Sequence, residues 1–140
     1  MSRILAIDYG LKRCGLAVSD PLQLIATPLV TISTGQLIAF LDDYVKREKV
    51  ETLVVGMPLK GDGSDTDSTA AVRRFIAHIK ERFPYVPVFE EDERFTSKMA
   101  MQAMIDGGLK KKDRRDKTMI DKTSAAIILQ SFMQRRPDAG

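Results

Sequence analysis

The sequence predicts a single α/β domain over residues 1–140, built on a mixed five-stranded sheet with helices on both faces. Three β-type runs come before the first helical pattern, and their short links favour antiparallel hairpins. Two later runs each follow a helical pattern, which favours right-handed crossovers and parallel pairing. A chain of 140 residues suits one such domain and can bury a sizeable core.

The first three strands are expected close together at the start of the chain. Ile4–Ile7 is an apolar run that ends at Asp8, and a tight link leads to a second strand at Cys14–Ser19. A third strand is expected at Ile25–Ile32. Pro28 lies inside it and cannot donate a ladder hydrogen bond, so this strand is expected at a sheet edge or a bend.

A helix is predicted next, capped by Ser33 or Thr34. Its apolar stripe has helical spacing and consists of Leu37, Ile38, Leu41, Tyr44 and Val45. The fourth strand is expected at Thr52–Val55, followed by Gly56, which serves either a turn or a close approach of substrate to the backbone. Leu59–Asp67 is polar and contains glycine, which predicts a loop.

The second helix carries an apolar face and is closed by Pro84. That face consists of Val72, Phe75, Ile76 and Ile79. The fifth strand is expected at Val86–Phe89, with the acidic run Glu90–Glu93 directly after it. A helix that contains Met99, Met104 and Ile105 should stop at Gly107-Gly108, and a last helix is expected at Ile120–Phe132. This order of elements is typical of the ribonuclease-H-like architecture, although other mixed α/β sheets stay open.

Composition narrows the class of protein. With 44% hydrophobic and 29% charged residues, the chain has the composition of an ordinary globular protein. It shows neither a bilayer-spanning apolar stretch nor a signal-peptide pattern, so a cytoplasmic location without a membrane partner is expected. The single cysteine, Cys14, excludes an internal disulfide framework and a cysteine-based zinc site.

Positive charge is concentrated in one segment near the C-terminal helix. Its six basic residues are Lys110, Lys111, Lys112, Arg114, Arg115 and Lys117. Such a run is either a solvated loop or a phosphate-binding loop, since clustered basic side chains bind nucleic acid by releasing counterions. Charge alone leaves both interpretations open.

Carboxylates occur at three places that the predicted sheet would bring together. Asp8 ends the first strand, the Asp92-Glu93 pair follows the fifth, and Asp121 lies near the start of the last helix. Hard cations such as Mg²⁺ or Mn²⁺ prefer carboxylate oxygens, and such ions can assist phosphodiester cleavage. Each residue also has a structural explanation: Asp8 in a turn, Asp121 at a helix start, and Glu93 in a surface ion pair. Strand alternation leaves open whether Asp92 or Glu93 points into the site.

Four segments, in order along nearly the whole chain, resemble the motifs of the YqgF/RuvX family. They are Asp8–Asp20 (DYGLKRCGLAVSD), Val54–Leu59 (VVGMPL), Asp92–Ser97 (DERFTS) and Ile120–Ala126 (IDKTSAA). The resemblance implies a ribonuclease-H-like fold related to the RuvC Holliday-junction resolvases. It also implies a nuclease that processes the 5′ end of the small-subunit (16S) ribosomal RNA precursor.

The resemblance further implies a catalytic and metal-binding triad of Asp8, Glu93 and Asp121, and thus favours Glu93 over Asp92. Compared with the RuvC resolvases, this chain departs at one position: Thr118 stands where they carry an Asp three residues before the last catalytic one. The missing carboxylate argues against junction resolution and against tight binding of a second metal ion.

Candidate phosphate contacts lie close to these carboxylates. Lys12 and Arg13 follow Asp8 on a hairpin, where a solvated tip is the alternative, and Arg94 follows Glu93. The basic residues of segment 110–117 are further candidates. The chain has no Trp and only nine Phe and Tyr residues, which disfavours a single-strand stacking platform and favours structured RNA. His78 is expected to be a surface or packed histidine rather than a general base.

Three classes of function compete. The leading hypothesis is a nuclease on pre-ribosomal RNA, with a Holliday-junction resolvase or a non-catalytic RNA-binding ribosome assembly factor as alternatives. A phosphotransferase is disfavoured because actin-like kinases clasp nucleotide between two such domains, and 140 residues supply one. A resolvase would need a homodimer to cut two strands symmetrically, whereas a trimming nuclease can act as a monomer.

Overall fold

A computed structural model describes residues 2–60, 62–93 and 117–135, with the side chains of residues 117–121 outside the description. Its centre is one five-stranded sheet in the order β3-β2-β1-β4-β5. The strands are β1 (Arg3–Asp8), β2 (Arg13–Ser19), β3 (Ala26–Ser33), β4 (Val50–Met57) and β5 (Val88–Asp92). β1, β4 and β5 are parallel, while β2 and β3 are antiparallel neighbours. The predicted mixed five-stranded sheet is therefore confirmed.

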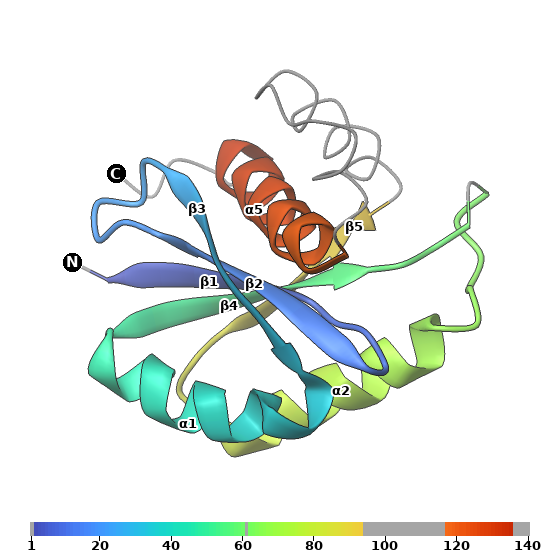
Figure 1. Cartoon of the computed structure of the whole chain (residues 1–140), viewed down its shortest axis with the longest axis horizontal. Coiled ribbons are helices and arrows are strands. Elements are labelled where there is room, and N and C mark those ends of the chain that lie inside the picture. Colours follow the sequence, from blue (N-terminus) through green and yellow to red (C-terminus); the bar gives the residue numbers. More distant parts are fainter. Residues whose placement is uncertain (1, 61, 94–116, 136–140) are drawn as a thin grey trace.

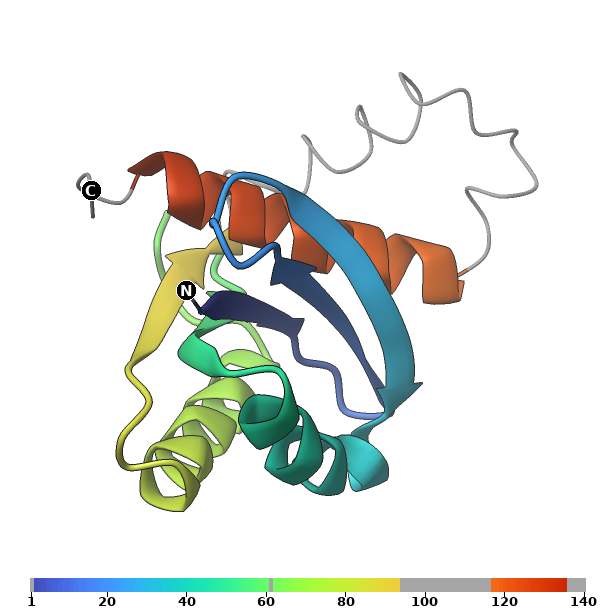
Figure 2. The same cartoon turned by 90° about the vertical axis from the view of Figure 1, so that its left-hand side faces the viewer.

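Helices cover both faces of this sheet (Figures 1 and 2). On one face lie α1 (Leu37–Arg47), preceded by the short 3₁₀ turn η1 (Thr34–Gln36), and α2 (Thr69–Arg82). On the other face lies α5 (Lys117–Arg135), which crosses the strands diagonally. Of the helices that the structure describes, none combines the length and the apolar character needed to cross a membrane.

Two hydrophobic cores result from the alternation of side chains along β1 and β4. Leu5 and Ile7 of β1 pack into the core on the α1 and α2 side. Ile4 and Ala6 pack on the opposite side with α5. Because both faces of these strands are covered, their central residues, Ile4–Ile7 and Leu53–Val55, form continuous apolar runs instead of alternating with polar residues.

The parallel strands end together at one edge of the sheet. Ile7 pairs with Val55, and Met57 at the end of β4 pairs with Asp92 at the end of β5. Figure 1 shows this edge on the right, where the connection from β4 to α2 leaves the sheet. In open α/β sheets, ligands bind at the carboxyl ends of parallel strands, so this edge is where a functional site is expected.

β3 lies at one edge of the sheet, as Pro28 predicts. Pro28 is opposite Ala17, and the pairing register shifts between Leu16 and Ala17. An edge position and a shift in register are the two ways in which a strand accommodates a residue without an N–H.

The predicted fifth strand is displaced along the chain. β5 runs from Val88 to Asp92, so three of the four acidic residues lie within it and Glu93 alone follows it. Its pairing with β4 continues to the end of both strands, and the Leu53 N–H donates to the Pro87 carbonyl at 2.9 Å just before β5 begins. Backbone pairing therefore outweighs the low strand propensity of acidic residues here.

Two helix starts also differ from expectation. Ser33 precedes η1 without forming a side-chain cap, while the Thr34 hydroxyl donates to the Gly10 carbonyl at 2.6 Å and ties η1 to the β1–β2 hairpin. α5 begins at Lys117 and ends at Arg135, so it is longer than the predicted Ile120–Phe132. The predicted helix with Met99, Met104 and Ile105 lies outside the described residues.

The C-terminal end of α5 is fixed to β5 by an ion pair. Glu91 is 5% exposed, and the Arg135 guanidinium donates to its Oε1 from Nε at 2.9 Å and from Nη2. The Arg135 side chain is itself 59% exposed, so solvent screens part of the attraction. Loss of the ion pair costs stability mainly through Glu91, because a buried carboxylate that loses its cation keeps its full desolvation cost.

Arg135→Ala is expected to destabilise the protein by about 2 kcal/mol and to lower the thermal midpoint by roughly 6 °C, since it leaves the Glu91 carboxylate buried without its cation. Thermal unfolding measures the effect. In a double variant with Glu91→Gln, much of the loss should be recovered because no buried charge then lacks a partner. An unchanged midpoint for Arg135→Ala would contradict the role of this ion pair.

Candidate active site

Asp8 and Glu93 lie next to each other at the carboxyl edge of the sheet. Asp8 is the last residue of β1, and Glu93 directly follows β5. Alternation along β1 places Asp8 on the same face as Ala6, which is the face covered by α5. The two carboxyl groups are joined by a hydrogen bond between their side chains.

The same alternation distinguishes Asp92 from Glu93. In β5, the ring of Phe89 lies against Phe132 of α5 and Glu91 pairs with Arg135, so every second residue faces that helix. Glu93 continues this series, whereas Asp92 falls in the series of Val88, which packs against the opposite core. Glu93, rather than Asp92, therefore shares a sheet face with Asp8.

Gly56 of β4 provides the space in which Glu93 lies. A β-carbon at Gly56 would be 2.9 Å from the carboxyl carbon and Oε1 of Glu93, and 2.6 Å from Cδ1 of Ile128 on α5. Glu93 thus rests directly on the backbone of β4, and α5 packs against the same point. Gly56 therefore does not form the turn that the sequence suggested, since it lies within β4 and has a glutamate over its α-carbon.

Burial of Glu93 raises the pKa of its carboxyl group, and the negative charge of Asp92 raises it further. The hydrogen bond with Asp8 acts in the opposite direction. The site therefore holds two acidic groups in contact, at least one of them where a negative charge is costly. Divalent cations such as Mg²⁺ and Mn²⁺ would offset that cost and prefer such oxygen ligands, so the residues present fit a metal ion of this type.

A Glu93→Gln variant is expected to be more stable than the wild type in EDTA at pH 8, by about 1 kcal/mol or roughly 3 °C in thermal midpoint. Because the folded-state pKa of Glu93 is raised, ionisation costs stability in the wild type as pH rises above the unfolded-state pKa. The amide cannot ionise, so the advantage should disappear at pH 4. Thermal unfolding from pH 4 to pH 8 measures it, with exposed Glu81→Gln as the control. If the difference in thermal midpoint between Glu93→Gln and the wild type does not vary with pH, ionisation of Glu93 is not its cause.

The backbone of α5 carries Asp121 across the face on which Asp8 and Glu93 lie. Asp121 precedes Ile128 by seven residues, which is close to two helical turns, so both positions lie on the same side of the helix. Ile128 is the residue that touches the site at Gly56. The side chain of Asp121 lies outside the described residues, and among those that are described no group of three metal-binding side chains occurs.

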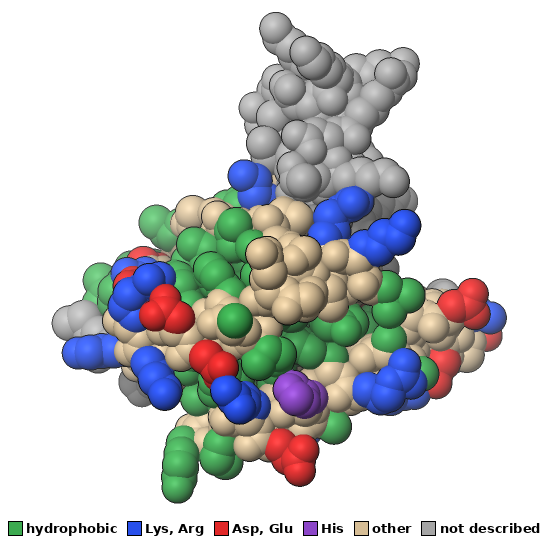
Figure 3. Space-filling view, turned by 60° about the horizontal axis from the view of Figure 1, so that its bottom comes forward, with side chains coloured by type: hydrophobic (Ala, Val, Ile, Leu, Met, Phe, Trp, Pro, Cys, Tyr) green, Lys and Arg blue, Asp and Glu red, His purple; other side chains and the backbone are tan. Residues whose placement is uncertain are grey.

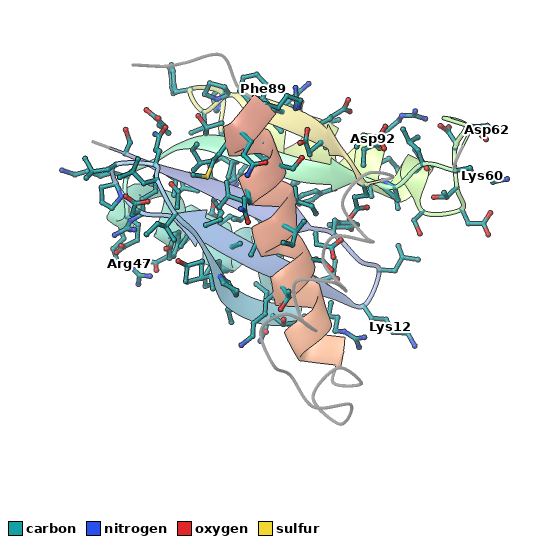
Figure 4. The ribbon with its side chains drawn as sticks, turned by 90° about the horizontal axis from the view of Figure 1, so that it is seen from above. Lys12, Arg47, Lys60, Asp62, Phe89 and Asp92 are labelled. Atoms are coloured by element: carbon teal, nitrogen blue, oxygen red, sulfur yellow. The ribbon has the colours of Figure 1, made fainter. Side chains whose placement is uncertain are left out.

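The β1–β2 hairpin carries two of the predicted phosphate contacts. Lys12 is exposed at its tip and Arg13 is half-buried at the start of β2. A β-carbon at Gly10 would be 2.4 Å from the Arg13 carbonyl oxygen, so the tight hairpin needs glycine there. In Figure 4, Lys12 and Asp92 lie toward the same end of the sheet, whereas Arg47 lies toward the other.

The remaining predicted phosphate contacts lie in or next to segment 94–117. Those outside the described residues are Arg94, Lys110, Lys111, Lys112, Arg114 and Arg115. Lys117 is the first residue of α5, and its side chain is not described. His78 is exposed on α2, as expected from the sequence.

Comparison with known proteins gives a consistent result. The model of the family described as "RuvX: Holliday junction resolvase" matches residues 2–135. A protein of Christiangramia forsetii is 53% identical over 95% of this chain and 98% of its own length. One of Amoebophilus asiaticus is 51% identical over 95% and 94%. Both carry the name "Putative pre-16S rRNA nuclease".

Solved structures share the fold at low sequence identity. Thermus thermophilus RuvC in complex with a Holliday junction substrate superimposes with a TM-score of 0.59 at 19% identity, covering 96% of both chains. The yeast mitochondrial Holliday junction resolvase Ydc2 gives a TM-score of 0.58 at 13% identity over 95% of this chain and 78% of its own. The ribonuclease-H-like fold is thereby established. On the family match and these relatives, the chain belongs to the RuvX family.

Proposed function

We propose that this protein is a metal-dependent nuclease that processes the 5′ end of the 16S ribosomal RNA precursor. The observation that carries the proposal is the contact between the Asp8 and Glu93 carboxyl groups at the carboxyl edge of the sheet. The names of the relatives supply the substrate, and such a substrate implies action in the cytoplasm.

Asp8, Glu93 and Asp121 are the residues that would hold Mg²⁺ or Mn²⁺. Such an ion, when bound, activates water for attack on phosphorus and stabilises the leaving oxygen. Asp8 ends the paired strand β1 and Glu93 directly follows the paired strand β5, which fixes both backbones, and Gly56 and Ile128 confine the Glu93 carboxylate. Sites supported by regular elements are more precise than sites on loops, which favours catalysis here.

Basic residues would position the RNA backbone on this edge. Lys12 and Arg13 on the hairpin are the nearest candidates along the chain to Asp8. The others are Arg94, Lys110, Lys111, Lys112, Arg114, Arg115 and Lys117. Binding through these contacts should weaken steeply with salt, since each neutralised phosphate releases counterions.

The test uses purified protein, a 16S precursor RNA with its 5′ extension, and a four-way DNA junction, each with Mn²⁺ or with EDTA. Cleavage of the RNA at its 5′ side in Mn²⁺, and none in EDTA, is the expected result. RNA binding without cleavage under any metal condition would refute the nuclease and support an assembly factor.

A Holliday-junction resolvase is the second candidate, because the matched family is described by that activity and the fold is that of RuvC. Symmetric cutting of a junction requires two active sites related by a two-fold axis. Cleavage of the DNA junction by a dimeric species, with the RNA left intact, would therefore replace the RNA-processing proposal.

A further inference from the structure

A pocket of about 310 Å³ opens on the face of the sheet opposite to Glu93. It lies between the β1–β2 hairpin, the start of α1 and the outer side of α2. Its lining includes Tyr9, Leu11, Arg74, Phe75 and His78. None of the functional residues predicted from the sequence lines it.

The pocket is connected to the candidate active site through β1. Tyr9 follows Asp8 directly, and alternation turns it toward the α1 and α2 side. Its ring stacks on that of Phe75, with centroids 4.5 Å apart and an angle of 20° between the planes. This pair and the exposed Leu11 give the pocket an apolar, largely aromatic wall at the carboxyl edge of the sheet.

Positive charge lies on the other side of the pocket. Arg74 and His78 are one helical turn apart on α2, and no carboxylate is among the lining residues. Other arginines of α2 are neutralised: Arg73 pairs with Asp65, and Arg82 pairs with Asp42. Arg74, in contrast, forms no ion pair with any described residue.

The charge near this pocket is therefore local and does not belong to a uniformly basic face. Figure 3 looks toward this side of the molecule and shows basic and acidic side chains interspersed. A uniformly basic surface would attract any polyanion without fixing where on the surface it binds. A guanidinium that no described carboxylate neutralises, beside an aromatic wall, instead matches the two parts of a nucleotide, a phosphate and a base.

We propose that this pocket binds one nucleotide of the RNA beyond the cleaved bond, with the base against the Tyr9–Phe75 wall and a phosphate at Arg74 and His78. The strand would pass from the catalytic edge around the β1–β2 hairpin, where Lys12 is exposed. This proposal rests on the proposed nuclease function, because it extends the path of the same substrate.

The test measures binding of a hairpin RNA with a single-stranded 5′ extension in EDTA, so that no cleavage is needed. The chain has one histidine, so the ring signals of His78 in an NMR spectrum need no assignment. Arg74→Gln removes the pocket's charge, and Lys80→Gln removes an exposed charge from the same helix outside the pocket. Salt titrations are recorded for both variants.

RNA should shift the His78 ring signals saturably. Arg74→Gln should raise Kd about tenfold and reduce the slope of log Kd against log salt by about one, while Lys80→Gln changes neither. Unshifted His78 signals with bound RNA, or equal effects of the two variants, would overturn the subsite. Cleavage assays separate the two proposals. If the wild type cleaves RNA and Arg74→Gln binds and cleaves equally well, the subsite is refuted and the nuclease function stands. If RNA shifts the His78 signals but is never cleaved, the nuclease function is refuted and the binding site stands.

Discussion

Asp8→Asn is expected to reduce precursor cleavage at least a thousand-fold, which corresponds to about 4 kcal/mol of transition-state stabilisation. The amide is nearly the same size as the carboxylate but lacks the negative charge that a hard divalent cation needs. It can still donate a hydrogen bond to Glu93, so the local packing should survive. Single-turnover cleavage with saturating protein and Mn²⁺ measures the loss separately from binding.

Asp43→Asn is the matched control for this variant. Asp43 is an exposed carboxylate on α1 that pairs with Arg47. In Figure 4, Arg47 lies at the end of the sheet opposite Lys12 and Asp92. Asp43→Asn should cleave like the wild type. Asp8→Asn should also bind RNA with wild-type affinity and keep its thermal midpoint within about 3 °C, which corresponds to about 1 kcal/mol in a protein of this size. Retained cleavage by Asp8→Asn would remove this residue from the catalytic site.

Gly56→Ala is expected both to destabilise the protein, by about 2 kcal/mol, and to lower cleavage at least a hundred-fold. The added methyl group would lie 2.6 Å from Ile128 Cδ1 and 2.9 Å from the Glu93 carboxyl group, closer than van der Waals contact allows. To remove these steric overlaps, either α5 must move away from β4 or Glu93 must leave its place beside Asp8. Chemical denaturation and single-turnover cleavage measure the two effects.

A second substitution separates these two effects. Ile128→Val in the Gly56→Ala background removes the methyl group that meets the new β-carbon, so stability should recover in part. Cleavage should not recover, because Glu93 is still displaced. Gly35→Ala is the control, since a β-carbon there has no heavy atom within 4 Å. Full recovery of cleavage in the double variant would show that helix position, and not Glu93, causes the loss.

Much of the fold is predictable because its central strands, β1, β2 and β4, are largely buried. The apolar run of β1 and the short links to β2 and β3 define the hairpins, and Pro28 places β3 at an edge. The limits of β5 were not predictable from composition. Its acidic residues have low strand propensity, and their place in the strand depends on pairing with β4 and on Arg135, a residue 44 positions further along the chain.

For the candidate site, the sequence predicts that Asp8 and Glu93 lie close together but not the packing that surrounds them. The order of elements predicts that Asp8 and Glu93 lie at one edge of the sheet. The choice between Asp92 and Glu93 depends on which residues of β5 face α5, and the contacts of Phe89 and Glu91 with that helix decide it. The role of Gly56 was also missed, because its close neighbours Glu93 and Ile128 are distant in sequence. The pocket at Tyr9 has no sequence motif; alternation from Asp8 was the one signal available for it.

The two contacts that fix α5 determine its helical phase. Ile128 is seated against Gly56, and Arg135 is bound to Glu91 seven residues later, so the rotation of the helix about its own axis is set at two points. Each residue of an α-helix turns the chain by about 100°, so the rotation fixed at Ile128 and Arg135 also fixes the rotation of the helix at Asp121. The angular position of Asp121 is therefore dictated by residues that take no part in chemistry. One residue inserted between Asp121 and Ile128 would turn the position of Asp121 on the helix by about 100° relative to Ile128, although the sequence would keep every proposed ligand.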